Sequence, residues 1–301
     1  MYIISEIGIN ANGDLKLAKD MISEARNCGA DACKFQKRSV DIVYTQEFLD
    51  SPRETPPGVL AKLPYGGTTQ REQKHALEFS WDEYDQIDAH CRTVGIDWFG
   101  SAWDVDSLDF LEMYHPPFHK IASPMVTNLP FVRQVARLGR PVIMSTGMSY
   151  PQDIKRALDV LSYPSSKGIS LAPNSPKIIP GELVLMHCVS EYPVAPDQTF
   201  LMEIQALADY GYTVGYSGHE SGTTPTIAAV GVGATYIERH FTLDRASYGS
   251  DQAASLEPDG FRRIAGCARI AEDCLRYRPE EHLTAREIEN AMKLRYWEDH
   301  G

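Results

Sequence analysis

The sequence lacks several features that define common functional classes. Its six cysteines form no CxxC pair and no metal-type spacing, and such dispersed thiols are typical of a reducing compartment. The chain has fewer basic than acidic residues, with 29 Lys and Arg against 41 Asp and Glu, and its formal net charge is -12. This negative charge argues against nucleic-acid binding, which normally needs a basic surface. No apolar run approaches the ~18 residues of a membrane span, and no secretion signal opens the chain. We therefore expect a cytoplasmic protein that binds neither nucleic acid nor membrane.

Segments typical of strands and helices alternate along most of the chain. The apolar runs predict strands at residues 2–7, 31–36, 96–101, 118–122, 141–145, 182–188, 212–216 and 234–240. Helical periodicity lies between them, at residues 14–28, 81–94, 106–113, 128–138, 151–161, 200–210, 223–232 and 259–275. Such alternation predicts an α/β fold with a parallel sheet, and eight units predict a TIM (β/α)8 barrel.

Two regions interrupt or extend this pattern. We assign residues 1–280 to the barrel, with an excursion at 40–80 over its mouth, and residues 281–301 to a C-terminal helical extension. The part of the excursion at 51–79 is rich in Pro, Gly and Thr, and it is either a lid or an exposed loop. The extension carries an apolar stripe that either packs against its own barrel or joins two chains, and we expect a homodimer. The stripe consists of Ile288, Ala291, Leu294 and Trp297.

His219 and His240 each close an apolar run and stand 21 residues apart. Both would lie at the carboxyl ends of consecutive parallel strands, where α/β proteins keep their active sites. Imidazole favours divalent transition metals, so the pair predicts a metal site with positions open to substrate. His187 is expected to be a hydrogen-bonded core residue. The other histidines in the barrel, at 75, 90, 115 and 119, are expected to be solvated.

Polar residues gather at the ends of the other predicted strands. They are Glu6, Lys34, Gln36, Ser101, Lys120, Ser123, Ser145, Ser190, Tyr192, Ser217 and Glu238. In a barrel these positions converge on one mouth, and two ammonium groups with several hydroxyls suit a ligand that carries phosphate and carboxylate. Each lysine taken alone is more often a surface charge or an ion-pair partner. Glu238 equally fits a counter-ion in the barrel core.

Several segments, in this order, resemble the motifs of the sialic acid synthase family over about residues 3 to 260. They are EIGINANGD, GADACKFQ, FHKIAS, PVIMSTGM, HCVSEYPVAP, GYSGHE, IERHFTLDR and GSDQAASLEP. That family condenses phosphoenolpyruvate with an N-acylated aldose to form nine-carbon ulosonic acids.

The resemblance implies a role for each of the candidate residues. The donor phosphoenolpyruvate would be held by Lys34, Ser101, Lys120, Ser123, Ser145 and Ser217. A divalent ion, Mn²⁺ first and Mg²⁺ or Co²⁺ as alternatives, would bind His219 and His240. Glu6, Tyr192 and Asp251 would face the sugar, with Glu6 also a candidate for proton handling. Gln36 and Ser190 are counted with the substrate-binding residues.

The chain departs from the family pattern on the acceptor side. Met125 stands where a glutamate often binds the acceptor, and Ser190 replaces an asparagine. The chain ends soon after the last motif, so we expect the family's C-terminal antifreeze-like domain to be absent. The acceptor therefore stays open between N-acetylmannosamine, mannose and a bacterial di-amino sugar.

Two other functions fit the same residues. A Schiff-base aldolase would use Lys34 or Lys120 as the nucleophile, provided that burial lowers the pKa of the lysine. A non-catalytic barrel that binds sugar acids is the other alternative, although a barrel that had lost catalysis would be expected to have lost some of the two lysines and two histidines, and all four are present.

Overall fold

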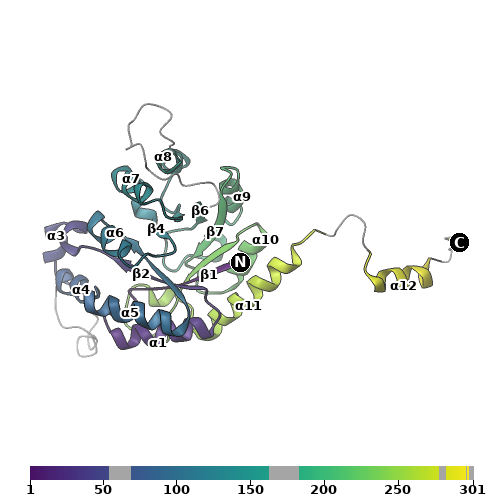
Figure 1. Ribbon diagram of the computed structural model, residues 1–301, viewed down its shortest axis with the longest axis horizontal. Helices are drawn as coiled ribbons and strands as arrows, with labels where there is room; N and C mark the ends of the chain where they lie inside the picture. The colour runs from purple at the N-terminus through teal and green to yellow at the C-terminus, as the bar shows by residue number, and fades with distance from the viewer. Residues whose placement is uncertain (54–68, 163–182, 278–282, 296, 298–301) are drawn as a thin grey trace.

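The computed structural model describes residues 1–53, 69–162, 183–277, 283–295 and 297, and within them eight parallel strands close into one barrel. The strands follow one another in sequence order, and the last pairs with the first (Figure 1). They are β1 (Tyr2–Gly8), β2 (Ala32–Lys37), β3 (Asp97–Ala102), β4 (His119–Ile121), β5 (Val142–Ser145), β6 (Leu183–His187), β7 (Thr213–Gly218) and β8 (Tyr236–His240). The predicted (β/α)8 barrel is confirmed.

Helices follow the strands and surround the barrel, apart from α12, which stands away from it (Figure 1). They are α1 (Leu15–Asn27), α2 (Val40–Val43), α3 (Gln46–Asp50), α4 (Gln70–Ala76), α5 (Trp81–Val94), α6 (Val105–Glu112), α7 (Leu129–Leu138), α8 (Pro151–Leu161), α9 (Glu203–Ala208), α10 (Thr224–Gly231), α11 (Pro258–Cys274) and α12 (Ala285–Leu294). The helix expected at 200–210 is shorter than predicted. Phe200 has a φ of 45°, which a right-handed helix does not allow, so α9 begins only at Glu203.

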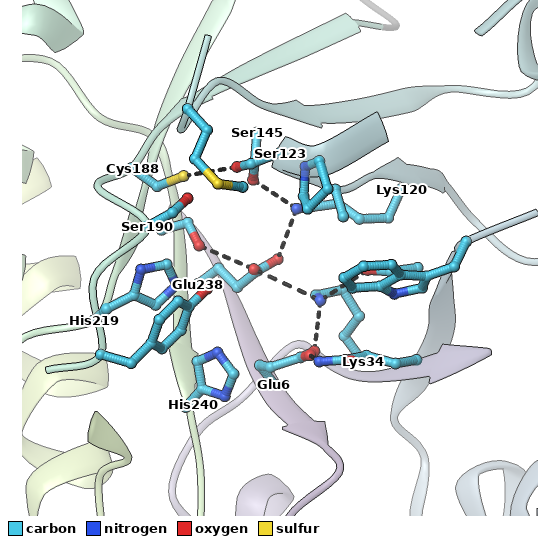
Figure 2. A pocket seen from close by; sticks show the side chains of 18 residues that line it. Glu6, Lys34, Lys120, Ser123, Ser145, Cys188, Ser190, His219, Glu238 and His240 are labelled. Carbon is cyan, nitrogen blue, oxygen red and sulfur yellow. Dashed lines mark hydrogen bonds and ion pairs between the residues drawn. The ribbon is translucent and has the colours of Figure 1, made fainter. Parts of the chain in front are cut away.

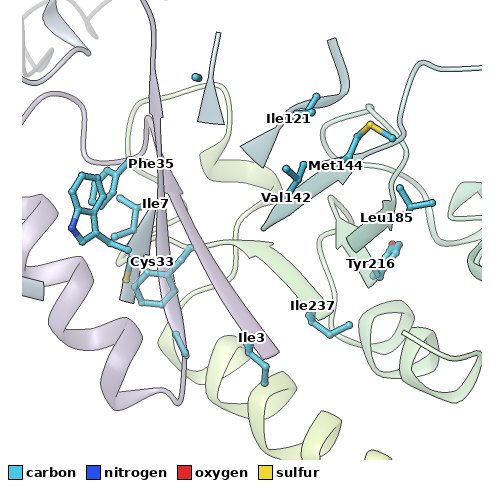
Figure 3. Close-up of a cluster of buried hydrophobic side chains, with 14 of the residues drawn as sticks. Ile3, Ile7, Cys33, Phe35, Ile121, Val142, Met144, Leu185, Tyr216 and Ile237 are labelled. Carbon is cyan, nitrogen blue, oxygen red and sulfur yellow. The ribbon is translucent and has the colours of Figure 1, made fainter. Parts of the chain in front are cut away.

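Strand residues alternate between two apolar layers. Every second residue faces the helices and joins the main core, as Figure 3 shows for Ile3 and Ile7 of β1 and for Phe35 of β2. The inward-facing set fills the lower part of the barrel. It consists of Ile4, Ala32, Phe99, Ile143, Val184 and Met186, with Tyr2, Phe118 and Tyr236 packed against it. The amino-terminal half of the interior is therefore apolar, and polar inward side chains are confined to the carboxyl ends of the strands.

The strand register brings those polar side chains to matching heights. Glu6 of β1 is opposite both Lys34 of β2 and His240 of β8. Ser101 of β3 is opposite Lys120 of β4, and Ser217 of β7 is opposite Glu238 of β8. Closure of the barrel thus places residues from the two ends of the chain side by side.

The excursion and the extension are described in part. Arg71 on α4 contacts Asp50 at the end of α3, with Nη2 and Oδ1 2.8 Å apart, so both sides of the excursion meet. Residues 54–68, on which the choice between a lid and an exposed loop depends, lie outside the described residues. Helix α12 has no buried residue and stands away from the barrel (Figure 1), so its stripe does not pack against its own barrel. Among the described residues, no helix is both long enough and apolar enough to cross a bilayer.

A buried ion pair fixes the top of the barrel between β7 and β8. Arg239 is 0% exposed and donates through Nη1 to Glu220 Oε1 at 2.9 Å and to Thr226 Oγ1 at 2.7 Å. Glu220 also accepts from Tyr216 Oη at 2.9 Å and from Thr226 Oγ1 at 2.6 Å. Glu220 and Arg239 are the sequence neighbours of the two predicted metal ligands, so this network positions both imidazoles.

Arg239→Met should lower the free energy of unfolding by about 3–5 kcal/mol, because it leaves the Glu220 carboxylate buried without its counter-charge. The double variant Arg239→Met/Glu220→Leu should recover part of this loss. Urea denaturation measures both. The control Arg276→Met removes an exposed ion pair with Asp273 and should cost less than about 1 kcal/mol. A loss for Arg239→Met no larger than that of the control would contradict the structural role of the pair.

Candidate active site at the barrel mouth

A cavity of about 220 Å³ opens at the carboxyl ends of the strands and collects nearly all the predicted site residues (Figure 2). Twelve of the thirteen line it, contributed by all eight strands or the loops that follow them. These are Glu6, Lys34, Gln36, Ser101, Lys120, Ser123, Ser145, Ser190, Tyr192, Ser217, His219 and His240. Asp251 is the exception and lies behind His240, with its Oδ2 atom 3.6 Å from Nδ1 of that histidine.

Glu238 lies at the centre of the residues that line the cavity, between the two lysines (Figure 2). Its Oε1 atom is 3.7 Å from Lys34 Nζ, its Oε2 atom is 3.7 Å from Lys120 Nζ, and Ser217 Oγ donates to Oε1 at 3.0 Å. The ammonium groups hold the pKa of the Glu238 carboxyl well below its usual range in spite of burial. The interpretation of Glu238 as a counter-ion is confirmed. The same carboxylate also lines the cavity. The sequence pattern alone did not show whether Glu238 faces the cavity or only balances charge in the barrel core.

The two lysines differ in their surroundings. Lys34 Nζ lies 2.6 Å from Glu6 Oε2 and donates to Ser101 Oγ at 3.1 Å. Burial alone disfavours its ammonium form, but Glu238 and Glu6 outweigh burial and raise the pKa of Lys34. Lys120 Nζ donates to Ser145 Oγ at 2.6 Å, and here burial prevails over Glu238 and lowers the pKa of Lys120. One lysine is therefore firmly cationic, and the other releases its proton more easily.

A small polar pocket, which we call the cradle, lies beside Lys120 and is formed by Ser123, Gly147, Cys188 and Ser190. A Cβ atom at Gly147 would come within 2.4 Å of Ser190 Oγ, 2.7 Å of Cys188 Sγ and 2.9 Å of Ser123 Oγ, so only glycine leaves this space open. The Ser190 hydroxyl is buried and has no hydrogen-bond partner among the described residues. Burial raises the pKa of Cys188, which keeps it a neutral thiol. The cradle thus offers neutral hydroxyl and thiol groups next to an ammonium, a setting that suits an anion.

The two histidines form a pair at the opposite side of the cavity from Lys120 (Figure 2), with ring centroids 5.5 Å apart. Nδ1 of His219 lies 2.6 Å from Val189 O, and because a carbonyl only accepts, Nδ1 carries the proton and Nε2 keeps its lone pair. Burial lowers the pKa of His219 to about 3, so its imidazole is neutral near pH 7. Nδ1 of His240 is buried and makes no hydrogen bond within the described residues.

These properties fit a divalent metal ion. Both ligands are close together, one has its tautomer fixed by a backbone carbonyl, and the other has an unused buried nitrogen. The described residues contain no group of three or more His, Cys, Asp or Glu side chains with metal-binding geometry. The protein would therefore supply two imidazoles, and water or substrate oxygens would fill the remaining positions.

Two further side chains line the mouth, and a third, Met125, does not reach it. Trp103, which follows β3, lines the cavity, and its indole Nε1–H is buried without a partner among the described residues. Met148 lines it too and is 65% exposed. Met125 instead packs into the outer core and lines a neighbouring cavity, so its position offers the mouth no polar group.

The structure confirms the expectation for His187 and corrects the one for His119. His187 is buried, and its Nε2 lies 2.7 Å from Thr199 O, which confirms a hydrogen-bonded core residue. The expectation of a solvated His119 is wrong. Its ring is buried and its Nε2 lies 2.9 Å from Glu112 Oε2, because it starts a strand whose first side chain points at α6 and not at solvent.

The sequence is similar to those of a known protein family. The NeuB family model matches residues 21–278. The N-acetylneuraminate-9-phosphate synthase of Drosophila melanogaster is 38% identical over 266 residues, or 88% of this chain and 66% of that protein. The N,N'-diacetyllegionaminic acid synthase of Legionella pneumophila is 34% identical over 277 residues, or 91% of this chain and 73% of that protein. This chain thus spans about two thirds to three quarters of these relatives.

A solved structure shows the same likeness in three dimensions. The N-acetylneuraminic acid synthetase of Leptospira borgpetersenii superposes with a TM-score of 0.79 at 27% identity, covering 98% of this chain and 92% of that one. The fold is shared more widely, since a truncated 3-deoxy-D-arabino-heptulosonate 7-phosphate synthase of Thermotoga maritima gives a TM-score of 0.62 at 13% identity. Because the family model covers most of the sequence and the relatives exceed 30% identity, the chain belongs to the NeuB family.

Proposed function

We propose that this protein condenses phosphoenolpyruvate with an aldose to give a nine-carbon ulosonic acid and inorganic phosphate. The observation that carries the proposal is the buried arrangement of two lysines and a polar cradle facing a pair of neutral histidines across one cavity. The lysines and the cradle suit a donor with two anionic groups, and the histidines suit activation of an aldehyde. The synthase names of the relatives support the same reaction class.

The donor would lie over Glu238, with its phosphate and carboxylate shared between Lys34, Lys120 and the cradle. Both ammonium groups are fixed by serine hydroxyls and carboxylates before any ligand arrives. Such preorganised charges hold a flexible anion in one orientation and keep its C3 atom directed at the acceptor.

The reaction forms one carbon–carbon bond and one bond from C2 to the oxygen of water, and it breaks the C2–O bond to phosphate. C3 of phosphoenolpyruvate attacks the aldehyde carbon, and the aldehyde oxygen takes up a proton. Water adds at C2 and loses one proton, and the C2–O bond to phosphate then breaks as the phosphate takes up the second proton and a ketone is left at C2. A divalent ion held by His219 and His240, for which we propose Mn²⁺ with Mg²⁺ or Co²⁺ as alternatives, would supply Lewis-acid polarisation of the aldehyde. Glu6, whose Oε2 atom pairs with Lys34 at 2.6 Å, is placed to take the proton that the water loses.

The identity of the acceptor is a separate question. The relatives' names include both a 9-phosphate product and products without a named phosphate. N-acetylmannosamine, mannose and a di-amino sugar therefore remain candidates, each with or without a phosphate. The homodimer and the cytoplasmic location also stay predictions.

A Schiff-base aldolase is the second candidate function, and one observation favours it. Burial lowers the pKa of Lys120, and a buried amine that loses its proton readily is the nucleophile such enzymes use. The two mechanisms differ in their dependence on metal and in the covalent bond to lysine, so they can be separated experimentally.

Chelation should abolish the release of phosphate from phosphoenolpyruvate in the presence of an aldose, and added Mn²⁺ should restore it. A molybdate assay for phosphate measures both. Borohydride with either substrate should leave the enzyme active and its lysines unmodified by mass spectrometry. Full activity in EDTA together with a labelled Lys120 would establish the aldolase instead. No phosphate release with any aldose and metal would favour a binding protein.

Lys120→Met should lower kcat/KM for phosphoenolpyruvate by at least about 30-fold, since it removes a buried charge from the donor site. The far-ultraviolet circular dichroism spectrum should be unchanged. The control Lys16→Met removes a lysine on α1 that is 85% exposed and paired with Asp20, and it should keep full activity. Equal kcat/KM values for the two variants would remove Lys120 from the donor site.

A further inference from the structure

Asp251 is the one predicted site residue that does not line the cavity, and its carboxylate faces His240 instead. It belongs to the segment between β8 and α11, and its side chain is 17% exposed. From this arrangement we infer that Asp251 is a positioning residue and not a contact for the sugar. It accepts a hydrogen bond from Nδ1 of His240 and so directs Nε2 of that ring at the divalent ion. This inference rests on the metal site of the proposed function.

The two ring nitrogens of His240 have different surroundings. Nδ1 is buried and makes no hydrogen bond within the described residues, whereas the ring as a whole lines the cavity. A buried ring nitrogen needs a partner, and Oδ2 of Asp251 lies 3.6 Å from it. When Nδ1 carries the proton, Nε2 keeps its lone pair for a metal ion in the cavity.

The arrangement at His219 shows the same pattern with a different acceptor. There Nδ1 lies 2.6 Å from Val189 O, which fixes the tautomer and leaves Nε2 free. Metal-binding histidines usually donate their second ring N–H to a backbone carbonyl or to a carboxylate, and a carboxylate also makes the ring a stronger ligand. The imidazole pair would thus use one acceptor of each kind, Val189 O for His219 and Asp251 for His240.

One oxygen of Asp251 remains available for this bond. Oδ1 accepts a hydrogen bond from Ser250 Oγ at 2.7 Å, whereas Oδ2 makes none within the described parts of the chain. The distance of 3.6 Å from Oδ2 to Nδ1 of His240 exceeds that of a hydrogen bond, and a shift of less than about 1 Å closes it. Such contacts are often long in unliganded enzymes and tighten when the site is filled.

The backbone that carries Asp251 is fixed by the turn after β1. Asn10 donates through Nδ2 to Ser255 Oγ at 2.8 Å and to Phe241 O at 2.9 Å, and Gln252 Nε2 donates to Asn10 O at 3.1 Å. Ser255 Oγ in turn donates to the backbone oxygen of Asp251 at 2.7 Å. Asn10, Gln252 and Ser255 are all buried. The carboxylate is therefore held beside His240 by a buried network and not by an exposed loop.

Mn²⁺ binding to the protein without substrates tests the inference, with the free ion measured by electron paramagnetic resonance. Asp251→Ala should weaken Mn²⁺ binding by about 10- to 100-fold, the usual effect of losing a group that orients a metal-binding histidine. Asp251→Asn should keep most of the affinity, because its amide oxygen still accepts the Nδ1 proton. The far-ultraviolet circular dichroism spectrum should be the same for both variants and the wild type.

Asp259→Ala is the matched control, because it removes a fully exposed acidic side chain from the start of α11. It should leave Mn²⁺ binding unchanged. Wild-type affinity in Asp251→Ala would overturn the inference. Equal losses in Asp251→Ala and Asp251→Asn would overturn it too, since an effect of charge alone needs no hydrogen bond to His240.

Kinetics separate positioning from contact with the sugar. At saturating Mn²⁺, Asp251→Ala should keep its KM for N-acetylmannosamine within about threefold of the wild type, because no contact with the sugar is lost. A raised KM together with unchanged Mn²⁺ affinity would make Asp251 a sugar contact and overturn the inference alone. If the wild type binds no Mn²⁺, the metal site and this inference are both wrong. The expected binding pattern without phosphate release from any aldose would overturn the proposed reaction only.

Discussion

The parallel hydrogen-bonded register that closes β8 onto β1 is the constraint on which the rest of the structure depends. It sets Glu6 beside His240 on one side and beside Lys34 on the other, although these residues are far apart in the sequence. Since side chains alternate along a strand, a shift of one residue in this pairing would turn Glu6 toward the helices and replace it with Ser5 or Ile7. Glu6, Lys34 and His240 come together only in the observed register.

The site combines a high local charge density with deep burial. Two ammonium groups are compensated by Glu6 and Glu238, and each is held in addition by a serine hydroxyl. Below them the barrel interior is apolar, so the charged side chains pair with one another and with polar groups at their own level, such as Gln36 and Ser217. Arg239 and Glu220, buried outside the barrel wall, extend the same principle to the histidines. Rigid charges of this kind do not need to reorganise when substrate binds, which is the main source of electrostatic catalysis.

The sequence predicted the barrel and most of the side chains that line its mouth because both follow from local patterns. Alternating apolar runs identify strands, and polar residues at their last positions identify the mouth, as for Lys34, Ser101 and His219. The pattern could not show that Glu238 lies between the two lysines, since Glu238 is on β8 and the lysines are on β2 and β4. Nor could it show that Trp103 lines the cavity or that His119 is buried. Contacts between distant elements decide all three.

The central claim is that phosphate leaves phosphoenolpyruvate by cleavage of its C2–O bond as a new carbon–carbon bond forms at this site. Phosphoenolpyruvate labelled with ¹⁸O at the bridging oxygen tests this most directly, with the phosphate and the sugar acid both analysed by mass spectrometry. The account predicts one ¹⁸O atom in the released phosphate for each molecule of nine-carbon product. Label kept in the organic product, or phosphate released without any nine-carbon acid, would contradict it.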